Sequence, residues 1–181
     1  IMKRINCFIV YGELEATRQT VIQLSESPLV KNIYMITNDE QAKAIHPAFM
    51  LRVQDLWSTE TIRHIAGHSD TDYSLIYTKP DGLQTGLFAL ERFIFIAEDT
   101  NAGMVYSDYY ELKERIRTNH PVIDYQQGSL RDDFNFGSVL LYRGKALQDA
   151  AASMDPDYKF AGLYDLRLKV SQQSSLVHIN E

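Results

Sequence analysis

Cysteine and long apolar runs are scarce in this chain of 181 residues. Cys7 is the single cysteine, so an intrachain disulfide is excluded, and the apolar stretch around it suggests a buried thiol in a reducing compartment. No apolar run approaches the ~18 residues that a transmembrane helix needs. The chain also opens without the charged-then-apolar leader of a secreted protein. We therefore expect a cytoplasmic protein without a transmembrane segment, and we leave peripheral contact with the inner membrane open.

Basic residues are outnumbered by acidic ones. The 18 Lys and Arg residues face 24 Asp and Glu residues, which gives a formal net charge of −6. A protein that reads a nucleic-acid backbone needs a basic face to release counterions from the phosphates, so this balance argues against nucleic acid as a partner. The acid excess suits metal-assisted binding of a phosphorylated small molecule, and it equally suits simple solubility.

Glycine-dependent motifs are also missing. The segment YGELEA at 11–16, which follows the first expected strand, contains one glycine. It therefore lacks both the phosphate-binding P-loop and the dinucleotide fingerprint, which disfavours NAD-dependent and P-loop enzymes. No Gly-x-Ser-x-Gly nucleophile elbow is present either.

Apolar strand patterns alternate with helical periodicity along the chain. Repeated strand–helix units with short connections imply a mostly parallel, doubly wound α/β sheet, in one domain that covers residues 1–181. The segment 109–117 is polar and amphipathic, and 118–136 is expected to form a long loop. Strands are expected at 3–10, 32–39, 73–77, 104–107, 137–142 and 175–179, with a short strand plus loop at 50–57, and helices at 13–27, 41–46, 58–68, 87–97, 144–153 and 163–170.

Two of these strands lead into carboxylates. MVYS at 104–107 is followed by Asp108, and YSLIY at 73–77 is followed by the turn that contains Asp81. In open α/β sheets ligands bind beyond the carboxyl ends of the strands, so both acids are candidates for a site. If the two strands lie side by side, Asp108 and Asp81 can share one ligand.

Several segments together resemble an inverting family 2 glycosyltransferase of the GT-A fold, a nucleotide-diphospho-sugar transferase-like fold. The strings HPVIDYQQGSLRDDFNFG and YSDY are similar to a Bacteroidetes-type subgroup of that family. Members of the family continue beyond the last core strand, so the resemblance implies that a C-terminal arm is missing here. The other matching segments are YGE at 11–13, TND at 37–39, ALERFIFIAED at 89–99, FAGLYDLRLKVS at 160–171 and SLVHINE at 175–181.

The resemblance implies roles for individual residues. It places the catalytic base, which takes the proton of the acceptor hydroxyl, on Asp165. It places the nucleoside near Asp39. It implies a divalent metal ion, Mg²⁺ or Mn²⁺, held by Asp81 and Asp108. The full set implied for nucleotide-sugar binding is Tyr11, Glu13, Asp39, Arg63, Lys79 and Asp81.

The chain departs from the family pattern at two motifs. Thr78-Lys79-Pro80-Asp81 stands where the family has Asp-x-Asp, so one carboxylate is left for a metal ion, and Lys79 could itself neutralise a diphosphate. Tyr164-Asp165 stands in place of Glu-Asp. Both remaining acids also have structural interpretations, because Pro-Asp-Gly is a common turn sequence and Asp165 could be an exposed helix residue.

A run of mixed polar and aromatic residues, RDDFNFG at 131–137, is a candidate sugar or acceptor site. Arg131, Asp132 and Asp133 can exchange hydrogen bonds with hydroxyls, while an aromatic ring covers the apolar face of a sugar. The alternative is that the rings anchor a loop and Arg131 pairs with a neighbouring acid at the surface.

The sequence thus predicts transfer of a sugar from a UDP- or GDP-linked donor to a glycan or other hydroxyl acceptor, with Asp165 as base. One alternative is a sugar-phosphate nucleotidyltransferase, which should carry a glycine-rich, basic loop after the first strand. The other alternative is a catalytically inactive carbohydrate-binding or assembly subunit, which the incomplete Asp-x-Asp motif favours.

Overall fold

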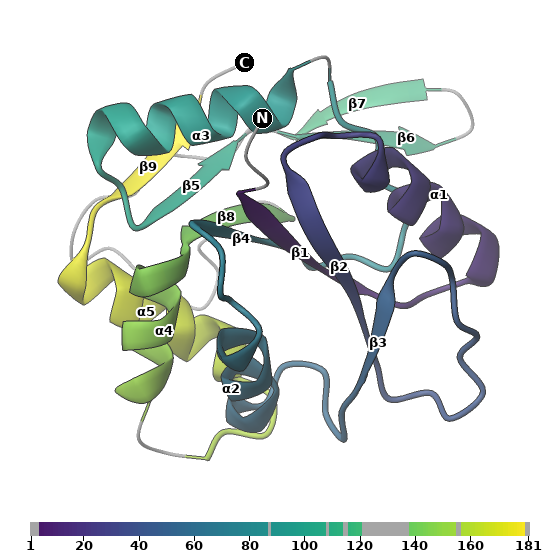
Figure 1. Cartoon of the computed structure of the whole chain (residues 1–181), viewed down its shortest axis with the longest axis horizontal. Helices are drawn as coiled ribbons and strands as arrows, with labels where there is room; N and C mark the ends of the chain where they lie inside the picture. Colours follow the sequence, from purple (N-terminus) through teal and green to yellow (C-terminus); the bar gives the residue numbers. More distant parts are fainter. Residues whose placement is uncertain are drawn as a thin grey trace.

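The computed structural model describes residues 4–86, 88–107, 138–154 and 157–179, and the backbone of strands 109–113 and 116–120. A seven-stranded sheet in the order β3-β2-β1-β4-β8-β5-β9 forms the centre (Figure 1). Its strands are β1 (Ile5–Val10), β2 (Val30–Thr37), β3 (Phe49–Arg52), β4 (Tyr73–Tyr77), β5 (Met104–Ser107), β8 (Val139–Arg143) and β9 (Leu176–Ile179). A separate hairpin consists of β6 (Tyr109–Lys113) and β7 (Ile116–His120).

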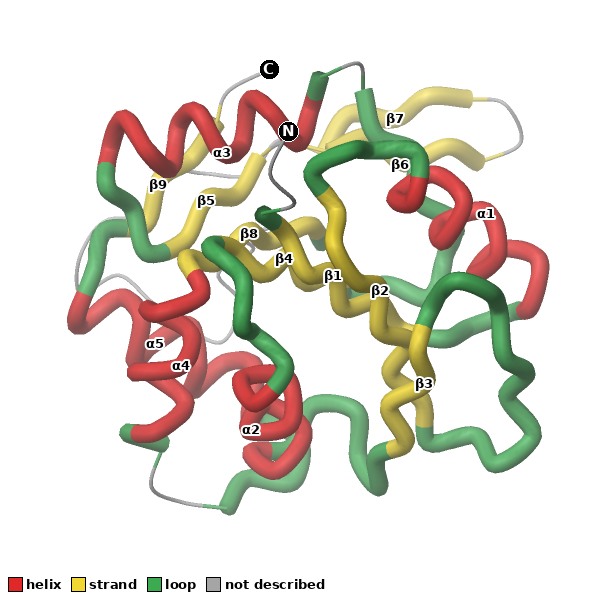
Figure 2. Tube along the Cα trace, viewed as in Figure 1, coloured by secondary structure: helices red, strands yellow, loops and turns green. Residues whose placement is uncertain are grey.

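Helices cover both faces of the sheet. α1 (Leu14–Ser25) and α3 (Ala89–Thr100) pack on one face, and α2 (Thr59–Gly67), α4 (Gly144–Ala152) and α5 (Gly162–Gln173) pack on the other (Figure 2). The alternation of side chains along β1 shows why two cores arise, because Cys7 and Ile9 belong to the α1/α3 side and Phe8 to the α2/α4/α5 side. Every residue of β1 is buried, as expected for a parallel strand covered on both faces.

Helix α2 begins where the sequence predicts. Ser58 has an extended backbone, and its hydroxyl oxygen accepts a hydrogen bond of 3.1 Å from the Thr61 backbone N–H. This N-cap satisfies one of the otherwise unpaired amides of the first turn. Ile62 and Ile65 point into the core, so the expected helix and its inward face are confirmed.

The segment 41–46 is a loop, so the short helix expected there is wrong. Backbone N–H groups of this segment donate hydrogen bonds to side chains instead of to helical carbonyl groups. The Gln41 N–H donates to the Asp39 carboxylate at 2.8 Å, and the Lys43 N–H donates to the Tyr11 hydroxyl at 3.2 Å. Six residues are too few to recover the cost of helix nucleation when side chains offer the backbone these partners.

The sheet is mostly parallel, with one strand reversed. β8 runs antiparallel to both β4 and β5 and lies between them. The condition under which Asp108 and Asp81 could share one ligand, that the strands 73–77 and 104–107 lie side by side, is therefore not met. The reason is a long-range pairing: β8, which comes much later in the chain, supplies the hydrogen bonds that β4 and β5 would otherwise exchange.

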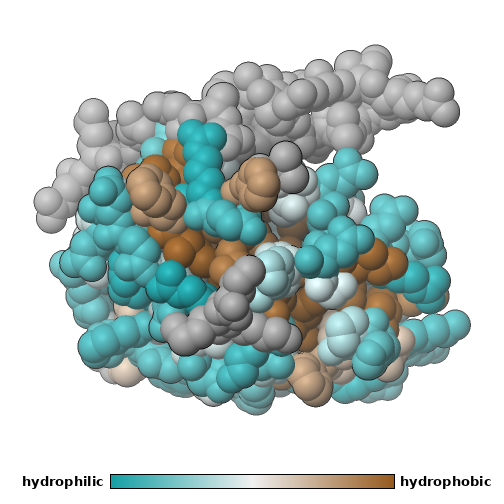
Figure 3. All heavy atoms as spheres, turned by 45° about the horizontal axis from the view of Figure 1, so that its top comes forward, coloured by the Kyte–Doolittle hydropathy of each residue, from teal (hydrophilic) through white to brown (hydrophobic). Residues whose placement is uncertain are grey.

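Large apolar side chains also reach the surface. Phe88, which precedes α3, and Phe95 on α3 are mostly exposed, and on the face drawn in Figure 3 brown apolar atoms show between teal polar ones. No helix among the described residues is long and apolar enough to cross a membrane.

Candidate functional site

The turns after the parallel strands meet at one edge of the sheet. β1 is parallel to β2 and β4, and β2 is parallel to β3, so their carboxyl ends lie together. We call the residues that follow them, 11–13, 38–39 and 78–82, the strand-end edge. Most of the residues implied for nucleotide-sugar binding belong to it.

The turn after β1 is packed directly against the turn after β4. A Cβ atom on Gly12 would lie 2.5 Å from the Pro80 carbonyl oxygen, so only glycine allows this approach. The Thr78 N–H donates to the Ser138 carbonyl at 2.9 Å, which holds the start of β8 at the same edge. The structure therefore brings Tyr11 and Glu13 beside Lys79 and Asp81.

Glu13 is engaged in capping α1. Its two carboxylate oxygens accept hydrogen bonds of 3.2 Å from the backbone N–H groups of Glu15 and Ala16. A helix N-terminus is otherwise a favourable place for a phosphate group. At α1 a carboxylate already occupies that place, and the connection from β1 consists of only three residues, 11–13.

Asp39 and Tyr11 belong to a second group at the edge. Asp39 is exposed after β2, and its backbone carbonyl accepts a hydrogen bond of 2.8 Å from the guanidinium of Arg52. Tyr11 is half-buried, and its hydroxyl reaches the loop at Lys43. Arg52 was not expected from the sequence. Its position at the end of a strand was the signal that could have identified it, because strand ends position ligand-binding residues.

Asp81 is exposed in its turn, and its charge acts on the end of β4. Burial, and then the Asp81 carboxylate, raise the pKa of the Tyr77 hydroxyl to about 12. Lys79, two residues before Asp81, is half-buried at the edge. The edge thus presents a cation and an anion next to one another.

The Tyr77 pKa provides a test of this geometry. The Asp81→Asn change should lower the pKa of Tyr77, because a negative charge near the phenolate is removed. The pKa should stay above the usual value near 10, since burial is the larger cause. Tyrosinate absorbance during alkaline titration, corrected with the Tyr77→Phe variant, measures the shift. An unchanged Tyr77 pKa in the Asp81→Asn protein would contradict the proximity.

Asp165 is buried rather than exposed. It lies in the first turn of α5 with 5% of its surface accessible, and its Oδ2 atom has no hydrogen-bond partner. The alternative interpretation as an exposed helix acid is therefore wrong. A buried carboxylate without full hydrogen bonding is costly, so Asp165 is a candidate functional residue.

The start of α5 is linked to the strand-end edge through the chain that follows β3. The Val53 N–H donates to the Thr37 carbonyl at 2.9 Å, so the chain leaving β3 stays beside the end of β2. That chain leads to Trp57, whose carbonyl accepts a hydrogen bond of 2.8 Å from Gly162, the first residue of α5. Asp165 follows one turn later.

Arg63 has different partners. Its guanidinium on α2 donates to the Met154 carbonyl at 2.8 Å and to the Asp157 carboxylate at 3.2 Å. These bonds join α2 to the connection between α4 and α5. Four other candidate residues, Asp108, Arg131, Asp132 and Asp133, lie outside the described residues.

The described residues do not form a metal site by themselves. Within this part of the chain, no three His, Cys, Asp or Glu side chains gather as ligands. At the turn after β4 the nearest positive charge along the chain is the side chain of Lys79.

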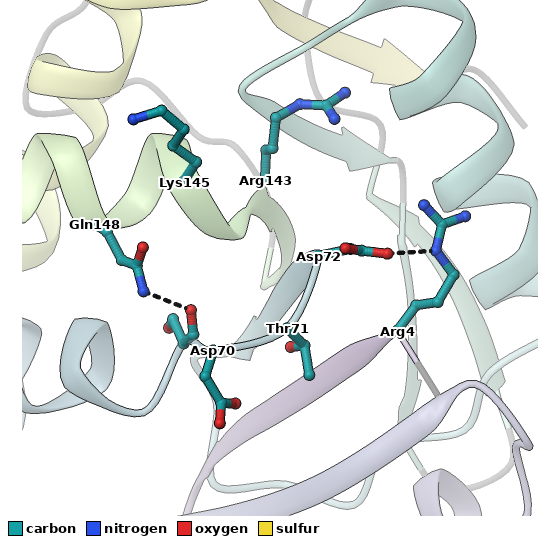
Figure 4. Close-up of a pocket in the computed structure, with 8 residues that line it drawn as sticks. Arg4, Asp70, Thr71, Asp72, Arg143, Lys145 and Gln148 are labelled. Carbon is teal, nitrogen blue, oxygen red and sulfur yellow. Dashed lines mark hydrogen bonds and ion pairs between the residues drawn. The ribbon is translucent and has the colours of Figure 1, made fainter. Parts of the chain in front are cut away.

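An open hollow of about 480 Å³ lies at the opposite edge of the sheet (Figure 4). Its charged groups are largely paired with protein atoms: Arg4 binds Asp72 at 2.8 Å, and Arg143 donates to the Ala97 carbonyl at 2.9 Å. The two guanidinium groups each lie 5.4 Å from the centre of the Tyr73 ring. This arrangement links β1, β4, β8 and α3, and we interpret it as structural. The lining residues are Arg4, Ser69, Asp70, Thr71, Asp72, Arg143, Lys145 and Gln148.

Solved structures match almost the entire chain. No family model and no curated protein matches it. The 2-C-methyl-D-erythritol 4-phosphate cytidylyltransferase of Francisella tularensis has a TM-score of 0.57 at 7% identity, with 98% of this chain and 90% of that chain covered. The corresponding enzyme of Thermus thermophilus has a TM-score of 0.55 at 8% identity, with 98% and 89% covered. CMP:2-keto-3-deoxy-manno-octonic acid synthetase, solved with CTP, has a TM-score of 0.57 at 11% identity, again with 98% and 89% covered.

The chain has the fold of the nucleotide-diphospho-sugar transferases. The fold class expected from the sequence is therefore confirmed. At identities this low, the similarity establishes a shared fold but does not establish a shared activity. Two of these similar structures are cytidylyltransferases by name and the third is a CMP-linked sugar acid synthetase, so the narrower assignment to family 2 glycosyltransferases stays a prediction.

Proposed function

We propose that this chain transfers a sugar from a nucleoside diphosphate sugar to a hydroxyl acceptor, as an inverting enzyme similar to family 2 glycosyltransferases. The observation that carries the proposal is the buried carboxylate of Asp165, which has an unpartnered oxygen and lies on a helix whose first residue is bonded to the chain that follows β3. A carboxylate that can take a proton next to a nucleotide-binding edge is what deprotonation of an acceptor hydroxyl requires.

In the proposed reaction the acceptor oxygen attacks the anomeric carbon while its proton passes to Asp165. The bond between the anomeric carbon and the phosphate oxygen breaks, and its electron pair leaves with the nucleoside diphosphate. Lys79 neutralises part of the charge that develops on the diphosphate. Asp39 and Tyr11 contact the nucleoside, and a glycan serves as acceptor. Mg²⁺ or Mn²⁺ bound at Asp81 would add further positive charge.

A sugar-phosphate nucleotidyltransferase is the second candidate, and the three similar structures favour it. That reaction needs donors for a nucleoside triphosphate, which we expect on a glycine-rich, basic loop after the first strand. Here the connection has three residues, 11–13, and the Glu13 carboxylate covers the start of α1. We therefore rank glycosyl transfer above nucleotidyl transfer.

Calorimetry with UDP, GDP and CTP, each with and without Mn²⁺, tests nucleotide binding. We expect UDP or GDP to bind, and we expect Lys79→Ala to weaken binding about tenfold because a charge-assisted contact to phosphate is lost. Lys145→Ala is the matched control, since Lys145 lies at the opposite edge and pairs with Asp149. If none of the nucleotides binds under either condition, an inactive carbohydrate-binding subunit becomes the better interpretation.

Products distinguish the two reactions. Glycosyl transfer releases a nucleoside diphosphate from a sugar donor, whereas nucleotidyl transfer from CTP to a sugar phosphate releases pyrophosphate. Pyrophosphate release that depends on a sugar phosphate would overturn our ranking.

A further inference from the structure

The segment 157–161 crosses the start of α2 and leads into α5. The Thr59 N–H donates to the Tyr158 carbonyl at 2.8 Å, and the Tyr158 N–H donates back to the Thr59 hydroxyl at 3.0 Å. At its far end the Gly162 N–H donates to the Trp57 carbonyl at 2.8 Å. The backbone of the segment is therefore held at both ends.

This anchored segment presents aromatic rings to solvent. Phe160 is 77% exposed and Tyr158 is 40% exposed. The ammonium group of Lys159 lies over one face of the Phe160 ring, 5.5 Å from its centre, and the opposite face is the one that we consider for a ligand. The carboxylate of Asp157 is held by Arg63 at 3.2 Å. Aromatic surface and hydrogen-bonding groups thus alternate along this short segment.

The position of the segment relates it to the proposed chemistry. Phe160 stands two residues before α5 and five residues before Asp165. A Cβ atom on Gly162 would lie 2.6 Å from the Ser58 carbonyl carbon, so the start of α5 is fixed against the chain that comes from the strand-end edge. This exposed ring therefore lies on the segment that leads directly into the helix of the proposed base.

We propose that Phe160 and Tyr158 form a stacking platform for a pyranose ring of the acceptor glycan, with Lys159 beside it as a hydrogen-bond donor. This inference rests on the proposed glycosyl transfer. A sugar presents an apolar ring face bordered by hydroxyls, which matches an exposed aromatic ring with charged neighbours. A protein partner would require a contiguous apolar area of several hundred Å², and the charged residues beside these rings interrupt this one.

The test uses saturation-transfer NMR with three probes: methyl β-D-glucopyranoside, methyl β-D-galactopyranoside and N,N′-diacetylchitobiose. We expect the unmodified protein to transfer saturation to ring protons of at least one probe. Phe160→Ala should reduce that signal about three- to tenfold, and Phe160→Trp should retain it. Phe95→Ala, which removes a ring that is 66% exposed on α3, is the matched control and should leave the signal unchanged.

Trp57 provides a second readout, because it is the only tryptophan and its carbonyl binds the start of α5. Its fluorescence should change on addition of the same probe, and less so in Phe160→Ala. Equal signals from Phe160→Ala and Phe95→Ala, or no transfer to any probe, would overturn the platform. Nucleotide binding, measured separately in Phe160→Ala, should be unaffected, so failure of the platform is distinguishable from failure of the proposed function.

Discussion

Replacement of Asp165 by Asn should reduce sugar transfer by about 100- to 10,000-fold, the range by which a positioned general base contributes to a rate. The amide has nearly the same shape as the carboxylate but cannot accept the proton of the acceptor hydroxyl. The loss should therefore fall on kcat, while the affinity for the nucleotide stays unchanged. Single-turnover kinetics and calorimetry on the same preparation measure the two quantities.

Two controls accompany this change. Asp149→Asn removes an exposed acid of α4 that pairs with Lys145 at 2.9 Å, and its transfer rate should equal that of the unmodified protein. Thermal unfolding of Asp165→Asn shows whether the buried position tolerates the amide. Because Asp165 Oδ2 has no hydrogen-bond partner, a neutral side chain there should not lower the melting temperature. A folded Asp165→Asn protein with an unchanged kcat would remove Asp165 as the base.

The second large effect is expected at Gly162. An added Cβ would lie 2.6 Å from both the carbonyl carbon and the carbonyl oxygen of Ser58 and 2.8 Å from the Thr59 nitrogen. All three are backbone atoms, so no side-chain rotation relieves the clash and α5 must move. Gly162→Ala should therefore lower the free energy of unfolding by about 1–3 kcal/mol, the usual cost of overpacking. Transfer should also fall, since the start of α5 positions Asp165.

Gly67→Ala is the matched control for this prediction. Gly67 is also helical, at the end of α2, but a Cβ there would meet nothing within 4 Å. Alanine is favoured over glycine in a helix by up to ~1 kcal/mol, so this variant should be as stable as the unmodified protein or slightly more stable. Chemical denaturation of both variants measures the difference. Equal stability of the two proteins would contradict the close packing at Gly162.

Local patterns in the sequence were enough to predict most elements of the fold. Ser58 begins α2 because a hydroxyl cap acts on amides two to three residues away, and such short-range chemistry is visible in sequence. The apolar run at the start of the chain predicts a strand buried on both faces, which β1 is. Turn residues after β2 and β4 likewise marked the edge of the sheet at which most of the candidate nucleotide-sugar-binding residues lie.

Pairings between strands that are far apart in the chain could not be predicted from local sequence patterns. The insertion of β8 between β4 and β5 joins residues such as Tyr73 and Arg143, which are far apart in the chain, and no local pattern encodes that partner. The burial of Asp165 depends on how α5 packs against other helices, so its sequence neighbours could not reveal it. The capping role of Glu13 could have been recognised, because an acid three residues before a helical amide is a local signal.

The antiparallel strand β8 also has a consequence for the order in which the chain assembles. β1 to β4 can pair with one another as soon as residues 5–77 have left the ribosome. In the described sheet β5 pairs only with β8 and β9, both of which come later in the chain. Residues 104–107 must therefore wait for the synthesis of residues 139–143 before they can join the sheet. During that interval a largely apolar strand has no partner in the sheet, and unpaired apolar strands of this kind favour aggregation.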